Sequence, residues 1–229
     1  MRNAKAIFKV SVISYVKIPA FIGTAAFFVL LPLVMYLIAQ DSTQSAAEFV
    51  RMFAPMFVGM SMVGTASAFV MGDKATMNLR FMAMAGVKPC QYLAGTGGSL
   101  LAIGFVIMVL FSQIAGYRGD ELLAFLAIGA FGASIAILLG MSIGMFKFPW
   151  LGQPIGMILA FGTMFSEANE ALASVFHFTF IQQLNNAFEA LVEYGSVNMA
   201  QTMPVLLGNA AVVVTLFVLV NWKHGLYKV

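Results

Sequence analysis

The stretch GDKATMNLRFMAMAGVKPCQYLAG, Gly72–Gly95, determines the fold class, because it places a short charged segment between two long apolar ones. It holds Asp73, Lys74, Arg80 and Lys88 in a chain of 229 residues, of which 9% are charged and 61% are hydrophobic. A soluble domain carries about a quarter of its residues as charged side chains. This chain therefore has too few polar groups to cover a globule, and lipid is its main solvent.

Apolar runs long enough to form membrane-spanning helices recur along the whole chain. Crossing about 30 Å of hydrocarbon takes roughly 20 helical residues. We therefore predict an all-α polytopic membrane protein in which residues 1–229 form a single transmembrane domain. Its six expected spans are residues 18–39, 52–71, 92–115, 122–145, 154–165 and 203–220.

Two segments outside these spans have an amphipathic pattern. Residues 1–17 mix basic and apolar side chains, which predicts an interfacial helix in the headgroup plane; a frayed start of the first span is the alternative. Residues 166–202 repeat apolar side chains at helical spacing, and Glu189 and Glu193 make a full crossing costly. We predict external amphipathic helices there, broken near Phe178, whose water-facing side is formed by Gln182, Gln183, Asn185 and Asn186.

The basic residues are distributed unevenly over the two sides of these spans. Ten of the twelve fall on the side of the termini, namely Arg2, Lys5, Lys9, Lys17, Lys74, Arg80, Lys88, Lys147, Lys223 and Lys228. The other side keeps Arg51 and Arg118. Because cytoplasmic loops carry the excess of Lys and Arg, we expect a multi-pass protein with both termini in the cytoplasm.

Segment 72–90 is cytoplasmic by this count, and its composition favours a helix. We expect Asp73 in the first turn, where a negative charge suits the helix dipole, and Gly86 at the stop. Methionine-rich surfaces adapt to partners, and without one this helix would expose its apolar residues, which are Met77, Leu79, Phe81, Met82 and Met84. A tight connector packed against its own spans is the alternative.

With six expected spans and this charged helix between the second and third, the chain resembles the permeases of type-2 ABC exporters. The family's motifs occur in the family's order, as Asp73-Lys74, Asn78-Leu79, Gly86-Val87 and Tyr92-Leu93-Ala94-Gly95. The chain departs from the usual Thr, Pro and Lys of the family at Asn78, Gly86 and Thr96.

The resemblance implies a membrane permease subunit driven by a separate ABC ATP-binding subunit. It also implies a homodimer whose central pathway is formed mainly by spans one, two and five. Segment 72–90 would be the coupling helix, and its contacts with the ATP-binding subunit are expected from Asp73, Lys74, Met77, Asn78, Leu79, Arg80, Phe81 and Met84. Small bacterial members of this family export peptides, bacteriocins or hydrophobic drugs, so we expect a bacterial cell membrane.

The sequence contains no phosphate-binding G-x-x-x-x-G-K-[ST] loop. ATP and Mg are therefore expected in the partner subunit, and this chain is expected to be no enzyme and to bind no cofactor. We expect no catalytic residue, metal site or nucleic-acid partner. The expected partners are the ATP-binding subunit, a second copy, membrane lipid, and a cargo that is an amphipathic peptide (a toxin or bacteriocin) or a hydrophobic drug.

Small residues four apart, as in Gly140-x-x-x-Gly144 and Gly152-x-x-x-Gly156, let helices in lipid approach closely. Packing within the chain is one use, and a dimer face at Gly152 and Gly156 is the other. Ser61 and Thr65 are candidates for lining the pathway, and a bond back to their own helix is the alternative.

The middle of each expected span lacks ionisable residues. Proton-coupled carriers need such groups, because a charge at the bilayer centre is costly and is kept only for function. This disfavours an energy-independent carrier, which is one alternative to the exporter. The other is a non-transport scaffold or assembly factor whose cytoplasmic insert recruits a soluble partner.

Overall fold

The computed structural model describes residues 2–16, 19–38, 45–146, 149–166 and 169–224. Over these residues the chain is 90% helix and has no strands, which confirms the all-helical class. The α-helices are α1 (Arg2–Val16), α2 (Pro19–Ile38), α3 (Ala46–Met56), α4 (Val63–Ala75), α5 (Asn78–Met84), α6 (Pro89–Tyr92), α7 (Gly98–Ala115), α8 (Gly119–Met145), α9 (Gly152–Ser166), α10 (Glu170–Phe176), α11 (Phe180–Tyr194) and α12 (Met199–His224). Two π-helical segments, η1 (Phe57–Met62) and η2 (Leu93–Gly97), and the 3-10 turn η3 (Pro149–Leu151) complete the order.

Two long rods contain the π-helical segments. α3, η1 and α4 form one continuous rod, Ala46–Ala75, which we call the central rod, and α6, η2 and α7 form another, Pro89–Ala115. Pro55 lies just before η1. Since proline has no N–H to give to the helical ladder, it favours irregular winding at this point.

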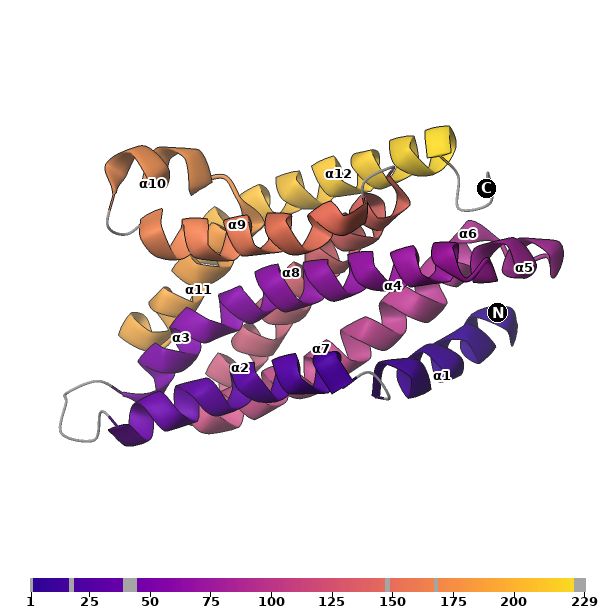
Figure 1. Cartoon of the computed structure of the whole chain (residues 1–229). Helices are drawn as coiled ribbons and strands as arrows, with labels where there is room; N and C mark the ends of the chain where they lie inside the picture. Colours follow the sequence, from indigo (N-terminus) through magenta and orange to yellow (C-terminus); the bar gives the residue numbers. More distant parts are fainter. Residues whose placement is uncertain (1, 17–18, 39–44, 147–148, 167–168, 225–229) are drawn as a thin grey trace.

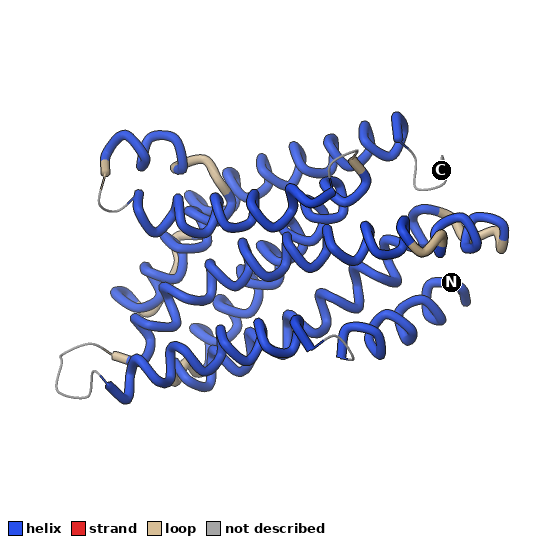
Figure 2. Tube along the Cα trace, in the orientation of Figure 1, coloured by secondary structure: helices blue, strands red, loops and turns tan. Residues whose placement is uncertain are grey.

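The helices form an elongated bundle in which successive rods run in opposite directions (Figure 1). α2, the central rod, the α6–α7 rod, α8, α9 and α12 lie along its long axis, as the tube view also shows (Figure 2). The first turn of α1 and the last turn of α12 lie at the end that carries α5, which we call the α5 end. α10 lies at the opposite end, which we call the α10 end.

Four helices in the described part of the chain are long and apolar enough to cross a membrane: Ala46–Ala75, Pro89–Ala115, Gly119–Met145 and Ala200–Trp222. They contain the second, third, fourth and sixth expected spans. These helices are compatible with a membrane protein.

The first and fifth expected spans correspond to α2, which has 20 residues, and to α9, which has 15. Within the described part of α2 the apolar stretch is Ala26–Ile38. At 1.5 Å per residue, α9 is about 22 Å long, which is less than the hydrocarbon thickness. The structure therefore supports four crossing helices by length and composition.

The central rod packs closely between α8 and α9 because both helices turn glycines toward it. A Cβ added to Gly140 of α8 would lie 2.3 Å from the Val63 carbonyl oxygen. A Cβ on Gly156 of α9 would lie 2.7 Å from the Gly59 carbonyl oxygen. These approaches require glycine, so the two small-residue motifs serve packing within the chain.

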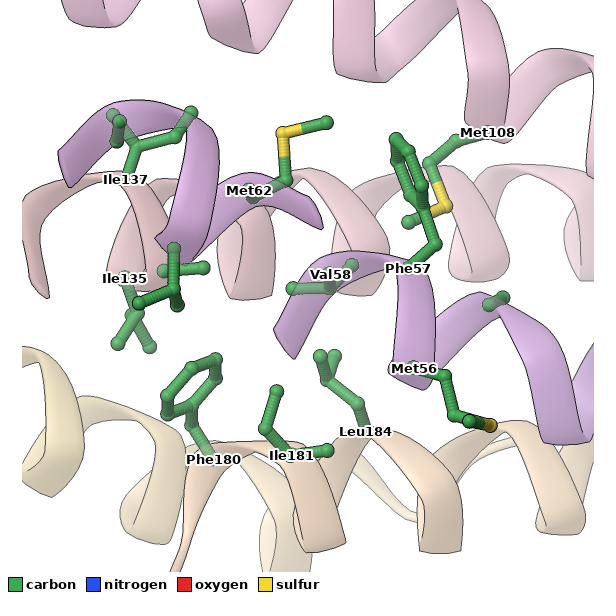
Figure 3. Close-up of a cluster of buried hydrophobic side chains, with 14 of the residues drawn as sticks. Met56, Phe57, Val58, Met62, Met108, Ile135, Ile137, Phe180, Ile181 and Leu184 are labelled. Atoms are coloured by element: carbon green, nitrogen blue, oxygen red, sulfur yellow. The ribbon is translucent and has the colours of Figure 1, made fainter. Parts of the chain in front are cut away.

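The apolar core lies between the central rod, α7, α8 and α11 (Figure 3). Phe57 and Val58 are fully buried there, and Ile181 and Leu184 of α11 reach the same cluster. α11 is therefore packed into the bundle through its apolar face. The predicted break near Phe178 is confirmed, because α10 ends at Phe176 and α11 begins at Phe180.

The predicted water-facing side of this segment is wrong for two of its four residues. Gln183 and Asn185 are only 7% and 6% exposed. The Gln183 Nε2 donates to the His177 carbonyl oxygen at 2.7 Å, so the NH₂ group of this buried amide has a hydrogen-bond partner. Buried amides persist in an apolar bundle when their hydrogen bonds are made inside it.

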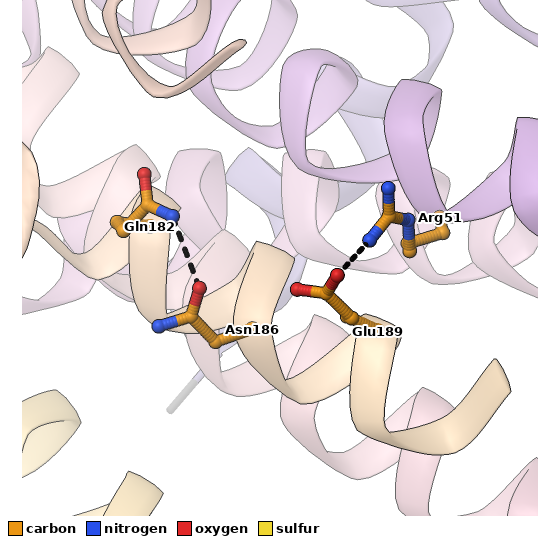
Figure 4. Close-up of polar contacts among 4 residues, drawn as sticks. All are labelled: Arg51, Gln182, Asn186 and Glu189. Carbon is orange, nitrogen blue, oxygen red and sulfur yellow. Dashed lines mark hydrogen bonds and ion pairs between the residues drawn. The ribbon is translucent and has the colours of Figure 1, made fainter. Parts of the chain in front are cut away.

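The partly exposed side of α11 carries two polar contacts (Figure 4). The Gln182 Nε2 donates to Asn186 Oδ1 at 3.0 Å. Arg51 of α3 forms an ion pair with Glu189 of α11 at 2.5 Å. This pair ties the start of the central rod to α11.

Candidate functional site

The corner between α4 and α5 contains the charged pair that opens the insert. α4 continues through Asp73 and Lys74 to Ala75, and Met77 then adopts a left-handed conformation with φ 57°. α5 begins only at Asn78 and has seven residues. The expected place of Asp73 in the first turn of the insert helix is therefore wrong. It lies in the last turn of α4, where the helix dipole does not favour an acid.

Side-chain donors hold Asp73 in that position. Asp73 as a residue is 9% exposed, and its carboxylate accepts hydrogen bonds from the Tyr92 hydroxyl at 2.7 Å and from Asn78 Nδ2 at 3.2 Å. Bonds to an ionised acceptor are among the stronger ones in proteins. Asp73 thus joins the end of α4, the first residue of α5 and the end of α6.

Tyr15 of α1 lies close to this cluster. Burial, and then the Asp73 carboxylate, raise the pKa of the Tyr15 phenol above its ordinary value. The Tyr15 ring packs on Phe69 of α4, with ring centroids 4.6 Å apart. α1 is thereby part of the wall around Asp73.

Lys74 is also turned toward the bundle. Its Nζ donates to the Met145 carbonyl oxygen, the last residue of α8, at 2.9 Å. A cation suits a helix C-terminus, because the final carbonyl groups lack partners in the helix and carry negative partial charge. Lys74 therefore joins the ends of α4 and α8.

α5 ends as the sequence predicts. Gly86 has φ 74°, the Gly86 N–H donates to the Ala83 carbonyl oxygen at 2.9 Å, and the Val87 N–H donates to the Met82 carbonyl oxygen at 3.0 Å. This pair of hydrogen bonds is the Schellman motif. The motif favours glycine at the position of Gly86, because that residue adopts a left-handed conformation. The prediction of a stop at Gly86 is confirmed.

The eight residues expected at a partner interface divide into two groups. Asp73 and Leu79 are buried and Lys74 is half-buried, so these three hold the corner in place. The other five are exposed, namely Met77, Asn78, Arg80, Phe81 and Met84. Phe81 and Met84 are 62% and 67% exposed, which is a large fraction for apolar side chains.

A hollow of about 390 Å³ lies between α1 and α5. Val10 and Ser14 of α1 form one wall, and Asn78 and Phe81 of α5 form the other. Asp73 lies at its lining too, so the polar cluster at the corner borders this hollow.

A larger apolar groove of about 760 Å³ lies on the side of the bundle, between α2, the central rod and α9. Its lining includes Phe27, Phe28, Phe53, Met60, Phe161 and Met164. Sequence reasoning did not find this groove. The available signal was the large number of Phe and Met residues, which does not indicate where they gather.

The four residues predicted as candidates for a dimer face or a transport pathway are not part of the lining of this groove. Gly152 and Gly156 are buried, and a Cβ on Gly152 would meet the Ser67 side chain. Their packing surface is taken by the central rod, so these two glycines themselves form no face for a second copy. The Ser61 hydroxyl is buried without a hydrogen-bond partner among the described residues, and Thr65 is half-buried.

Tyr92 is the site residue that sequence reasoning missed. It occurs in the family motif, but only the structure shows that its hydroxyl reaches Asp73. Among the described residues, no group of three His, Cys, Asp or Glu side chains could hold a metal ion. The chain matches no protein-family model, no curated protein and no solved structure with which it was compared.

Proposed function

We propose that this chain is the membrane permease subunit of an ATP-driven exporter. It acts as a homodimer with separate ATP-binding subunits in a bacterial cell membrane, with six spans and both termini in the cytoplasm. The observation that carries the proposal is α5, a short helix at one end of the bundle, on which Phe81 and Met84 are exposed, as is Met77 just before it. An exposed apolar face of this kind indicates a partner surface.

The corner at the base of α5 is suited to transmit a movement of that partner to the bundle. Asn78 and Tyr92 both donate to Asp73, and Lys74 reaches the end of α8. Leu79, only 1% exposed, anchors the inner side of α5. Because α5 is bonded to the end of α4, and that end is bonded to α6 and α8, a displacement of α5 would move several rods together.

The apolar groove supports an apolar or amphipathic cargo. Its lining is aromatic and methionine-rich, and α2, the central rod and α9 correspond to expected spans one, two and five. Flexible methionine side chains adapt to differently shaped ligands. A hydrophobic drug or the apolar face of an amphipathic peptide fits this surface.

The arrangement of the ends supports an even number of crossings. The first turn of α1, the last turn of α12 and α5 lie at the same end of the bundle. Arg80 of α5 and Lys88, which follows that helix, are exposed, as are Lys5 and Lys9 of α1. An excess of basic residues marks a cytoplasmic side.

Co-purification tests the proposal. We would express the chain together with a candidate ABC ATP-binding subunit and compare the wild type with the double variant Arg80→Glu, Phe81→Ser. Both residues are exposed on α5, so the bundle should stay folded. The amount of ATP-binding subunit that co-purifies with the chain should fall at least tenfold. Val175→Ser, an equally apolar exposed site on α10, is the matched control and should retain the subunit.

Unchanged co-purification and unchanged ATPase activity in the α5 variant would contradict the exporter assignment. The exposed face of α5 also suits a scaffold that recruits a soluble partner without ATP hydrolysis. Loss of a bound protein that has no ATPase activity, in the same α5 variant, would favour that second function.

A further inference from the structure

We propose that the outward face of α1 binds an anionic phospholipid. Lys5 and Lys9 would contact its phosphate, and Phe8, Val12 and Ile13 would contact its acyl chains. This lipid site is separate from the apolar groove and from the exposed face of α5, and it does not depend on transport.

The opposite face of α1 is held against the bundle, so the outward face has a defined orientation. A Cβ on Gly95 of η2 would lie 2.6 Å from Ile7 Cγ2 and 3.0 Å from the Ala4 carbonyl oxygen, which shows how closely α1 approaches η2. Ser11 Oγ and Thr96 Oγ1 are 3.5 Å apart. With these contacts made on one face, α1 cannot turn Lys5 and Lys9 inward.

The charged side chains of the outward face are both basic. α1 contains no Asp or Glu between Arg2 and Val16. Lys5 and Lys9 are four residues apart, so they lie on neighbouring turns of one face, and both are exposed. Within the described part of the chain, neither lysine forms a salt bridge with a carboxylate. Their charge is complementary to an anionic headgroup.

A hollow of about 600 Å³ accompanies these lysines. Its lining consists of Lys5, Ala6, Phe8, Lys9, Val12 and Ile13, so two cations border an apolar surface. A soluble anion would use only the lysines and leave the apolar lining in water, which is unfavourable. A phospholipid provides both a phosphate for the lysines and acyl carbon for the apolar lining.

The position of α1 in the bundle is consistent with the headgroup level. α1 packs on η2 and α7, near the start of the candidate span Pro89–Ala115. α2 begins at Pro19 and continues into the apolar stretch Ala26–Ile38. A basic amphipathic helix in this position is where lysines meet lipid phosphates.

Lipid titration of the delipidated full-length chain in a neutral detergent tests the site. The probe is dioleoyl phosphatidylglycerol, and the bound fraction is measured by native mass spectrometry. Each lysine near an anionic lipid surface is worth about fivefold in affinity, so Lys5→Gln with Lys9→Gln should weaken binding about 25-fold. Lys5→Arg with Lys9→Arg should restore it, and Lys88→Gln, an exposed lysine outside the hollow, should leave it unchanged.

Two further arms separate the phospholipid from other ligands. Phosphatidylcholine should bind more weakly than phosphatidylglycerol and should not respond to the lysine variants. Ile13→Ser should weaken phosphatidylglycerol binding and should leave the melting temperature of the protein unchanged. Equal binding of phosphatidylglycerol to the wild type and the double Gln variant would overturn the proposal. Full displacement of the lipid by inorganic phosphate at millimolar concentration would overturn it too, by showing a site for soluble anions.

Discussion

At the scale of single residues, the corner below α5 depends on a buried acid that lies at an unfavourable place in its helix. Asp73 occupies the last turn of α4, where the carbonyl ends of the helix point toward it. The two donors Tyr92 and Asn78 offset this cost. The charge of Asp73 is therefore structural, although it belongs to a motif expected to face a partner.

Removing one of these donors should destabilise the protein. In Tyr92→Phe the ring remains but the hydroxyl that donates to Asp73 is lost, so a buried carboxylate keeps only the bond from Asn78. We expect a loss of about 1–3 kcal/mol in the free energy of unfolding, measured by thermal or denaturant unfolding in detergent. Tyr194→Phe, at an exposed tyrosine, is the control and should change stability little. Equal stability of the two variants would show that the Asp73 bond is dispensable.

Tyr117 should make stability depend on pH in the alkaline range. Burial, and then the Glu121 carboxylate, raise its pKa to about 12. The unfolded chain then loses this proton near pH 10 while the folded chain keeps it, so the free energy of unfolding falls as the pH rises from about 10 to 12.

Tyr117→Phe isolates this contribution. The Tyr117 hydroxyl is buried without a hydrogen-bond partner among the described residues, so its removal should be neutral or slightly stabilising at pH 7. Melting temperatures recorded from pH 8 to 11 should fall less steeply in the variant than in the wild type. Parallel curves would show that the phenol titrates as freely in the folded chain as in the unfolded one.

At the scale of elements, the central rod decides how the helices pack. Gly140 on α8 and Gly156 on α9 approach its backbone from two sides, and both contacts leave no room for a Cβ. In lipid, close backbone approach is a main source of helix association, because the hydrophobic effect does not drive helices together there. The glycines therefore determine which helices become neighbours.

Gly140→Ala should separate α8 from the central rod. Its Cβ would lie 2.3 Å from the Val63 carbonyl oxygen, so the backbones must move apart, at a cost of about 1–3 kcal/mol. Gly208→Ala in α12 is the matched control, because no atom lies within 4 Å of the added Cβ there. That control should be unchanged or stabilised by up to about 1 kcal/mol through helix propensity. The comparison is made by thermal unfolding in detergent, and a loss of the same size in both variants would contradict the close packing.

α11 shows that a helix predicted to lie at the outer membrane interface can also pack into the bundle. The spacing of its apolar residues would be the same at a membrane interface and inside a bundle. In the structure, Leu184 lies so close to Gly132 of α8 that a Cβ on that glycine would clash with it. The ion pair between Arg51 and Glu189 is partly exposed, so we assign α11's attachment mainly to its buried apolar residues.

At the scale of the whole molecule, the apolar groove and α5 lie on different parts of one bundle that the central rod connects. The rod contributes Phe53 and Met60 to the groove and carries Asp73 at its other end. In the proposed exporter, movement of α5 would thus reach the groove through a single continuous helix.

In the proposed exporter, filling the groove should impair transport without unfolding the protein. Met164 of α9 lines the groove and is partly exposed, so Met164→Trp has space for the larger ring and should narrow the binding surface. We expect cargo-stimulated ATPase activity of the reconstituted complex to fall at least fivefold. Met157→Trp, at a similarly exposed methionine of α9 outside the groove lining, should retain it. Equal stimulation in both variants would place the cargo elsewhere.

The local features of this molecule followed from the sequence. The helical class, the stop at Gly86 and the break before Phe180 are confirmed, because they depend on composition and on residues near one another in the chain. The four crossing-length helices also agree with expected spans, since hydropathy over about 20 residues needs no knowledge of neighbours.

Tertiary structure alone decided which side of each helix faces the protein. In water an apolar side chain indicates the core, but in lipid apolar side chains cover both the core and the outer surface. The sequence therefore did not reveal that Asp73 points inward to Tyr92, that Lys74 reaches Met145 across 71 positions, or that α11 lies within the bundle. These features depend on partners that only the packing of the rods brings together.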